Sequence, residues 1–339
     1  MHHCIGSKTV FVNFGPTASH MAQPNPPKSI NPFDSLHAAP TESADDEELT
    51  ACVLSFNAND PSGAAGLAAD VLAIACVGAH PMPITTGVYV RDTAEILEFF
   101  SLDEDAVESQ ARAVLEDVSV QIIKVGFLGT PETITKVAEI TADYDDVPVV
   151  AYMPNLSWWT DAETDNYLDA FTELMLPQTT VLVGNHSTLW RWLLPDWSSE
   201  RSPSARDLAH AASSHGVAYT LVTGIPLPDQ YIDNVLATPE AVLGGEKFER
   251  FEANFIGAGE TLSAALAALL ANGDDLVAAT KEALVFLDRS LDAGFRPGMG
   301  HVVPDRLFWA QPDEEKTPLS DEEMRMLQTL DMPTSDTKH

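Results

Sequence analysis

The sequence predicts an α/β fold in which helices cover both faces of a doubly wound, mostly parallel central sheet. Between about residues 51 and 310, short strand-like runs alternate with helical segments. Such alternation is typical of parallel strands that are joined by crossover helices. Polar and glycine-rich segments follow the strand-like runs, and ligands of open α/β sheets bind at the carboxyl ends of the strands. We therefore expect one binding site along that edge.

The first half of this region contains four predicted strands and three predicted helices. The strands are predicted at residues 52–56, 83–90, 121–129 and 147–153. The helices are predicted at residues 64–78, 102–118 and 131–144. Acids open the second helix and a proline opens the third, and both are favourable in a first helical turn. Strand and helix therefore alternate throughout this half.

The second half continues the alternation, with strands predicted at 180–185 and 218–225. A further helix is predicted in the segment "NFIGAGETLSAALAALL" at 254–270. From Thr261 onward the residues are mostly good helix formers, with no Gly or Pro before Gly273. Apolar residues surround this helix on nearly every side, which predicts that it is buried.

A glycine-rich turn, Gly257-Ala258-Gly259, leads into this helix and is followed directly by Glu260. Glycine lets a ligand approach the backbone closely, and the unpaired N–H groups of a first helical turn attract anions. Two interpretations follow. Glu260 is either a favourable acid at a helix start or a base beside an anion hole for a transferring phosphoryl group. The local motif alone leaves both open.

The composition favours a globular protein without nucleic-acid or membrane partners. The 339 residues, of which 45% are hydrophobic, suffice for one large α/β domain or two ordinary ones. The 51 acidic and 18 basic residues give a net charge of −33, which repels nucleic acid and anionic membranes. No transmembrane-length stretch or signal peptide is apparent, and the three cysteines lack metal-ligand spacing. We expect a cytoplasmic protein.

Two tails flank the predicted domain at 51–310. Residues 1–50 are rich in Pro, Ser and acidic residues and have no apolar period, which predicts a disordered N-terminal tail. Residues 311–339 have a similar composition and are predicted to form an acidic C-terminal tail.

Six sequence motifs follow one another along the domain. They are "NDPSGAAGLAAD" (59–70), "KVGFLGTPE" (124–132), "MLPQTT" (175–180), "LVTG" (221–224), "GAGETLSAALAALLANG" (257–273) and "FRPGMGHVVPDRLFWA" (295–310). In this order and spacing they resemble the hydroxymethylpyrimidine/phosphomethylpyrimidine kinases of thiamine biosynthesis, which are members of the ribokinase-like superfamily. The resemblance covers about residues 51–310 and implies a ribokinase-like kinase domain there.

The resemblance also implies an activity. ATP phosphorylates the hydroxymethyl group of an aminopyrimidine, hydroxymethylpyrimidine, and then the resulting monophosphate. Such a reaction needs a base for the hydroxyl proton, donors for the phosphoryl charge, and Mg²⁺ on the phosphates. By likeness to the anion-hole turn of the family, Gly257, Gly259 and Glu260 are the expected catalytic residues. Many relatives pair as dimers, so the resemblance also implies a homodimer.

The same motifs imply the binding residues. Those for the substrate are Asp60, Ala65, Asp70, Tyr89, Arg91 and Phe127. Those for the nucleotide are Asn185, Thr223, Gly224 and Ala258. No set of metal-ligating residues is predicted.

Several residues depart from the family pattern. Arg91 stands where a glutamine reads the aminopyrimidine, and arginine only donates hydrogen bonds, which suits an acid or a phosphate. Tyr152 stands where an aspartate lies near the metal and phosphates, and Thr188 replaces an acid that helps to hold Mg²⁺. Two alternatives therefore stay open. One is a catalytically weakened paralogue that binds a pyrimidine or nucleotide in a binding or regulatory role, and the other is a kinase with a changed small-molecule substrate.

Some of these residues also allow purely structural interpretations. Asp70 is either a substrate residue or a solvated or capping acid, and Lys124 is either a site residue or an ion-pair partner. Phe127 suits a pocket wall and a core position equally. We expect His186 and His215 at the surface rather than as metal ligands.

Overall fold

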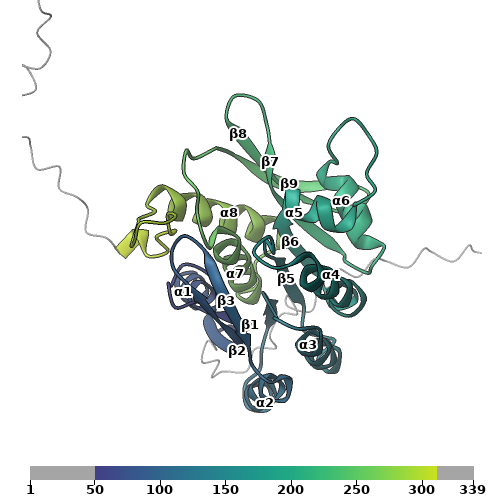
Figure 1. Ribbon diagram of the computed structural model, residues 1–339, viewed down its shortest axis with the longest axis vertical. Coiled ribbons are helices and arrows are strands. Elements are labelled where there is room, and N and C mark those ends of the chain that lie inside the picture. The colour runs from purple at the N-terminus through teal and green to yellow at the C-terminus, as the bar shows by residue number, and fades with distance from the viewer. Residues whose placement is uncertain (1–49, 311–339) are drawn as a thin grey trace, which may run out of the picture. The chain divides into compact units, whose positions relative to one another are not determined.

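The computed structural model describes residues 50–310. Within this range nine strands form one sheet, in the order β3-β2-β1-β4-β5-β6-β7-β8-β9 (Figure 1). The two predicted tails, apart from Thr50, lie outside the described residues.

Six neighbouring strands of the sheet run parallel. They are β2 (His80–Arg91), β1 (Cys52–Asn59), β4 (Ile122–Val125), β5 (Val149–Met153), β6 (Val181–Asn185) and β7 (Tyr219–Pro226). Buried Val, Ile and Leu residues dominate the central strands because helices cover both faces of the sheet. The predicted mostly parallel, doubly wound sheet is confirmed.

Three antiparallel strands extend the two ends of the sheet, and the sequence analysis did not predict them. They are β3 (Ile96–Ser101), β8 (Tyr231–Ala237) and β9 (Val242–Glu249). The outermost strands, β3 and β9, expose many of their side chains. β9 therefore lacks the continuous apolar run that marks the buried parallel strands, whereas Glu98 interrupts the apolar residues of β3.

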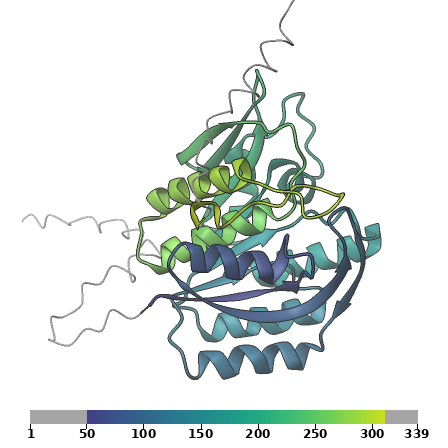
Figure 2. The ribbon, with the colours of Figure 1, turned by 90° about the vertical axis from the view of Figure 1, so that its left-hand side faces the viewer.

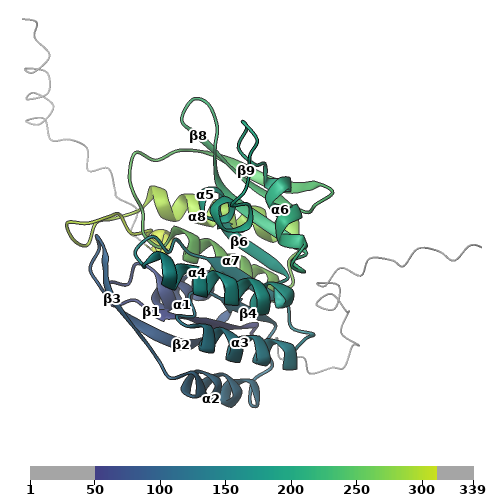
Figure 3. The ribbon, with the colours of Figure 1, turned by 45° about the vertical axis from the view of Figure 1, so that its right-hand side comes forward.

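Helices form one layer on each face of the sheet (Figures 2 and 3). One layer contains α1 (Gly66–Cys76), α7 (Ala258–Ala271) and α8 (Leu276–Asp292). The other contains α2 (Glu104–Leu115), α3 (Pro131–Asp143), α4 (Asp161–Ala170), α5 (His186–Leu193) and α6 (Ala205–Ser213). Alternate residues of a strand enter opposite cores, as Val53 and Leu54 do in β1. Every residue of α7 from Thr261 onward is buried, which confirms the predicted buried helix.

The described α-helices begin in two different ways. Most are closed by an N-cap side chain, which belongs to Asp103, Thr130, Thr160, Asn185, Ser204 or Asp275. Of the α-helices between residues 50 and 310, α1 and α7 alone begin without such a cap. These two helices pack against each other, so their open starts lie in the same layer.

Candidate active site

A cavity of about 560 Å³ opens at the carboxyl ends of β2 and β5, beside the starts of α1 and α7. Its lining includes Ala65, Tyr89, Arg91, Tyr152, Trp158, Gly257, Glu260 and His301. The structure thus brings together predicted site residues from both ends of the domain. His301 belongs to the last sequence motif, but the sequence analysis did not identify it as a site residue.

The turn before α7 requires glycine at its first position. Gly257 has a φ of 81°, in the left-handed region, and an added Cβ atom would lie 1.7 Å from the carbonyl oxygen of Ala64. Only glycine tolerates both conditions. The carbonyl oxygen of Gly257 accepts hydrogen bonds from the Thr261 N–H at 3.0 Å and from its hydroxyl at 2.7 Å. The start of α7 is therefore held tightly against the loop that precedes α1.

Arg306 joins these two helix starts, and the sequence analysis did not identify it. The residue is only 3% exposed. Its Nε donates to the hydroxyl of Thr261 at 2.8 Å, and its Nη2 donates to the carbonyl oxygen of Ala64 at 2.6 Å. Arg306 is not among the residues that line the cavity. It positions the turn, and a contact across 242 residues leaves no local signal in the sequence.

Glu260 is the third residue of α7 and lines the cavity. Burial raises the pKa of the Glu260 carboxyl, and the charge of Lys124 opposes part of that rise. A carboxylate with a raised pKa is a stronger base near neutral pH. The structure thus places a candidate base at a helix start whose N–H groups have no side-chain cap.

Asp70 and Lys124 form a fully buried ion pair outside the lining of the cavity. Lys124 Nζ lies 2.8 Å from both carboxylate oxygens of Asp70, and each side chain is 0% exposed. Ser55 Oγ and Asn57 Nδ2 donate to Asp70 Oδ2 at 2.8 and 2.9 Å. The interpretation of Asp70 as a solvated or capping acid is wrong, and its buried, partnered oxygens do not reach the cavity. The ion-pair interpretation of Lys124 is confirmed.

Arg91 lies in the cavity wall and is paired with Asp60. Arg91 Nη1 is 3.5 Å from Asp60 Oδ2, and the side chains are 6% and 0% exposed. Asp60 also accepts hydrogen bonds from the N–H groups of Ser62 and Ala65 at 2.8 and 2.9 Å. A carboxylate therefore offsets the guanidinium charge. The expectation that Arg91 suits an acid or a phosphate of the substrate stays a prediction.

An aromatic wall closes one side of the cavity. Tyr89 and Trp158 line it, with ring centroids 5.9 Å apart and an interplanar angle of 82°. Phe127 stacks on Tyr89 at 5.7 Å from behind and is 2% exposed, so it belongs to the core rather than to the cavity surface. A flat aromatic ligand can pack against such a wall.

The residues predicted for the nucleotide lie mostly at the ends of β6 and β7. Asn185 and Thr223 are paired in the sheet register. Gly224 follows with a φ of 67°, and its N–H donates to Asn234 Oδ1 at 3.0 Å. The side chain of Asn185 caps α5. Ala258 instead begins α7, so the structure assigns it to the glycine-rich turn.

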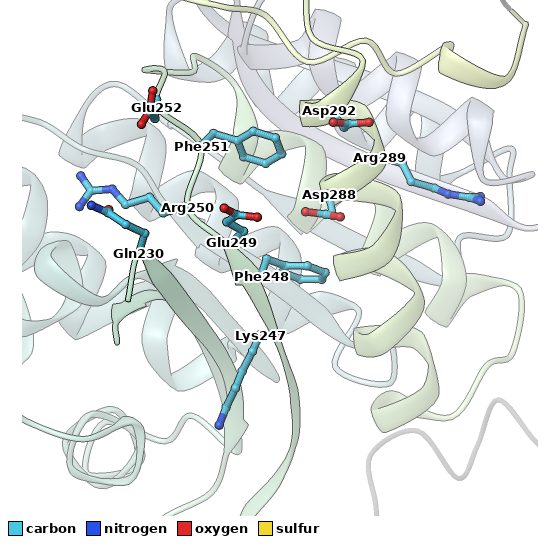
Figure 4. Close-up of a pocket in the computed structure, with 10 residues that line it drawn as sticks. All are labelled: Gln230, Lys247, Phe248, Glu249, Arg250, Phe251, Glu252, Asp288, Arg289 and Asp292. Carbon is cyan, nitrogen blue, oxygen red and sulfur yellow. The ribbon is translucent and has the colours of Figure 1, made fainter. Parts of the chain in front are cut away.

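A second cavity of about 560 Å³ lies between the end of β9 and α8. Since β9 runs in the same direction as β7, this cavity is at the same edge of the sheet. In Figure 4 the rings of Phe248 and Phe251 point toward α8, where Asp288 faces them. Burial raises the pKa of Asp288, and the charge of Asp292 adds to the rise. The sequence analysis did not anticipate this cavity.

Metal-binding and membrane-spanning features are not found between residues 50 and 310. No group of three or more His, Cys, Asp or Glu residues in this range could hold a metal ion. None of the described helices is both long and apolar enough to cross a membrane.

The two histidines that were expected at the surface differ. The surface position predicted for His186 is wrong, because this residue is buried and its Nε2 lies 2.8 Å from the Pro203 carbonyl oxygen. His215 is exposed, as expected.

The region that builds this site, residues 60–305, matches the sequence model of the phosphomethylpyrimidine kinase family. The chain belongs to this family. Among its relatives, the hydroxymethylpyrimidine/phosphomethylpyrimidine kinase of Streptomyces coelicolor is 28% identical over 260 residues, which cover 76% of this chain and 94% of the relative. The chloroplastic thiamine biosynthetic bifunctional enzyme TH1 of Arabidopsis thaliana is 26% identical over 248 residues, or 71% of this chain and 46% of that protein.

Solved structures support the fold of this phosphomethylpyrimidine kinase family member. An ADP complex of Bacillus subtilis pyridoxal kinase matches with a TM-score of 0.70 and 21% identity, covering 78% of this chain and all of the other. The phosphomethylpyrimidine kinase of Clostridium difficile matches with a TM-score of 0.59 and 18% identity, covering 70% and 98% of the two chains. The ribokinase-like fold and the family resemblance predicted from the sequence are confirmed.

Proposed function

We propose that this protein transfers the terminal phosphoryl group of ATP to the hydroxymethyl group of hydroxymethylpyrimidine, and then to the resulting monophosphate. The observation that carries the proposal is the uncapped start of α7, which places Glu260 beside a cavity with an aromatic wall. The relatives support it, since the Streptomyces coelicolor protein is named for both activities and others are named for thiamine biosynthesis.

The proposed reaction uses the residues of one cavity. The pyrimidine ring packs against Tyr89 and Trp158 and directs its hydroxymethyl group toward Glu260. Glu260 accepts the hydroxyl proton while the substrate oxygen forms a bond to the terminal phosphorus. The bond from that phosphorus to its bridging oxygen breaks, and ADP leaves. N–H groups at the start of α7, next to Gly257, stabilise the charge on the phosphoryl oxygens.

We place ATP along the ends of β6 and β7, beside Asn185, Thr223 and Gly224, with its phosphates at the glycine-rich turn. Pyridoxal kinases of this fold have been solved with ADP and with AMP-PCP. The cavity of Figure 4 lies at the same edge and offers aromatic rings and a carboxylate to a flat ring that bears an amine. We assign the adenine to it, with Asp288 as the acceptor of the amine hydrogen bond.

Mg²⁺ is proposed to arrive with the nucleotide. The described residues form no metal cage of their own, and Mg²⁺ commonly uses phosphate and water oxygens with only one or two protein ligands. Glu260 provides oxygen atoms of the kind that this ion accepts, whereas the side-chain oxygen of Asn185 already accepts two hydrogen bonds from Ser187. When bound, Mg²⁺ neutralises charge on the phosphates.

Turnover by the purified full chain tests the proposal. Hydroxymethylpyrimidine, its monophosphate and pyridoxal are offered with ATP, and the products are identified by mass spectrometry. We expect phosphorylation of both pyrimidines. Transfer to pyridoxal alone would support a changed substrate, and nucleotide binding without any transfer would support the weakened paralogue. Inosine triphosphate, which lacks the adenine amine, should show a higher KM than ATP, and equal KM values would contradict the role of Asp288.

A further inference from the structure

Tyr152 places its hydroxyl group at the second glycine of the turn before α7. It is the fourth residue of β5, at the carboxyl edge of the sheet. A Cβ atom added to Gly259 would lie 2.2 Å from the Tyr152 hydroxyl oxygen and 2.3 Å from its Cζ atom. The hydroxyl group therefore occupies the space beside the backbone that a side chain at position 259 would fill. A side chain at position 259 would collide with Tyr152, so this position also requires glycine.

The hydroxyl group of Tyr152 is available to a ligand. The side chain lines the same cavity as Glu260. Among residues 50–310 the hydroxyl has no hydrogen-bond partner, and it is not among the buried polar atoms that are closed off from solvent. A phenol can donate one hydrogen bond and accept others. Here it faces a space where the proposed substrate and phosphoryl group meet.

The surroundings keep this phenol protonated. Burial raises the pKa of Tyr152 well above its ordinary value, and the charges of Glu260 and then Asp70 add to the rise. At neutral pH the group is therefore a neutral hydrogen-bond donor. An aspartate, which the family pattern has at this position, would only accept hydrogen bonds when ionised.

The buried ion pair lies beside the ring of Tyr152. Lys124 Nζ lies 6.0 Å from the ring centroid, within the range of a cation–π contact. The ammonium group is itself held by both oxygens of Asp70 at 2.8 Å. A donor that is rigidly placed before the reaction stabilises developing charge best, because no reorganisation is needed at the moment of transfer.

We propose that the Tyr152 hydroxyl group donates a hydrogen bond to an oxygen of the phosphoryl group during transfer. The proposal rests on the proposed function and adds a residue to it. Tyr152 keeps its proton throughout, and the hydroxyl proton of the substrate still goes to Glu260. Tyr152 thus adds a side-chain donor to the backbone donors of the turn. It stands where the family pattern has an aspartate, which only accepts hydrogen bonds when it is ionised.

Tyr152→Phe tests the proposal because it removes only the hydroxyl group and keeps the ring over Lys124. Loss of one such donor commonly lowers kcat on the order of a hundredfold. We expect that fall in kcat with little change in KM for ATP or the pyrimidine, and with an unchanged thermal midpoint. Tyr144→Phe, at the end of α3 and away from the cavity lining, is the matched control and should keep full turnover.

A second measurement separates charge stabilisation from packing. Binding of ADP with aluminium fluoride and the pyrimidine imitates the transferring phosphoryl group and should weaken in Tyr152→Phe, while binding of ATP alone should not. An unchanged kcat in Tyr152→Phe would overturn the proposal, and so would a lower kcat accompanied by a lower thermal midpoint and weaker ATP binding. In either case, turnover by the wild type would still support the proposed function. Absence of turnover in the wild type would overturn both.

Discussion

Helices α4 and α7 both have a glutamate three residues after the N-cap but use it differently. The N-cap and glutamate are Thr160 and Glu163 in α4, and Gly257 and Glu260 in α7. In α4 the glutamate closes a capping box, since its Oε2 accepts from the Thr160 N–H at 3.2 Å and from its hydroxyl at 2.7 Å. In α7 the N-cap has no side chain, and the glutamate lines the cavity.

This difference shows how a small change at a helix start separates structural from catalytic use of an acid. A threonine N-cap satisfies a backbone N–H and keeps the glutamate on the helix. A glycine N-cap leaves both the acid and the first N–H groups to a ligand. The start of α7 is instead tied to the loop before α1 by the hydrogen bonds of Arg306 to Thr261 and Ala64.

Among the variants that test this difference between α4 and α7, Glu260→Gln should have the largest effect on turnover. Glutamine keeps the size and polarity of the side chain but is not a base, so turnover at saturating ATP should fall on the order of a hundredfold or more. ATP binding, measured by calorimetry, should be retained. Glu163→Gln makes the same exchange at the start of α4 and should leave turnover unchanged. Equal turnover of Glu260→Gln and wild type would show that Glu260 is only a helix-start acid.

Gly257→Ala should lower both stability and turnover, because a Cβ atom there meets the carbonyl oxygen of Ala64. Gly273→Ala is the matched control, since Gly273 has a φ of 92° but open space around the added atom. The control should lose only about 1–2 kcal/mol of unfolding free energy from left-handed strain. Gly257→Ala should lose more in urea unfolding. Equal losses of unfolding free energy in the two variants would mean that the contact between Gly257 and Ala64 does not contribute to stability.

The pH dependence of kcat should sharpen the comparison further. Glu260 must be ionised to act as a base, and burial raises the pKa of this carboxyl. Turnover should therefore decline as pH falls, with a midpoint above the value of about 4.3 for an ordinary glutamate. The decline should persist in Glu163→Gln and be absent from the residual activity of Glu260→Gln. A decline that survives in Glu260→Gln would assign it to another group.

Thr160→Ala should have the smallest effect, and it should change stability but not turnover. Loss of the capping box should lower the unfolding free energy by about 1 kcal/mol. Thr160 is not among the residues that line the cavity with Glu260, so turnover should stay at the wild-type level. A parallel loss of turnover would contradict the separation of structural and catalytic helix starts.

The parts of this structure that were predictable from sequence are those with a local signal. The buried parallel strands appear as apolar runs, and the start of α7 appears as two glycines and an acid before a buried helix. The antiparallel strand β9 lacks such a run because it exposes many of its side chains, and Glu98 interrupts the apolar residues of β3. The contacts of Arg306 and the position of Tyr152 against Gly259 depend on residues far apart in the chain, and no local pattern encodes them.

The position of Arg306 also decides when the site can exist during synthesis. Protein synthesis proceeds from the N-terminus, and Arg306 follows its partner Ala64 by 242 residues. The loop before α1 and the turn before α7 cannot be tied together until almost all of the described chain has left the ribosome. A nascent or prematurely terminated chain that lacks Arg306 therefore carries most of the sheet and the glycine-rich turn but not the clamp that holds its two open helix starts in place.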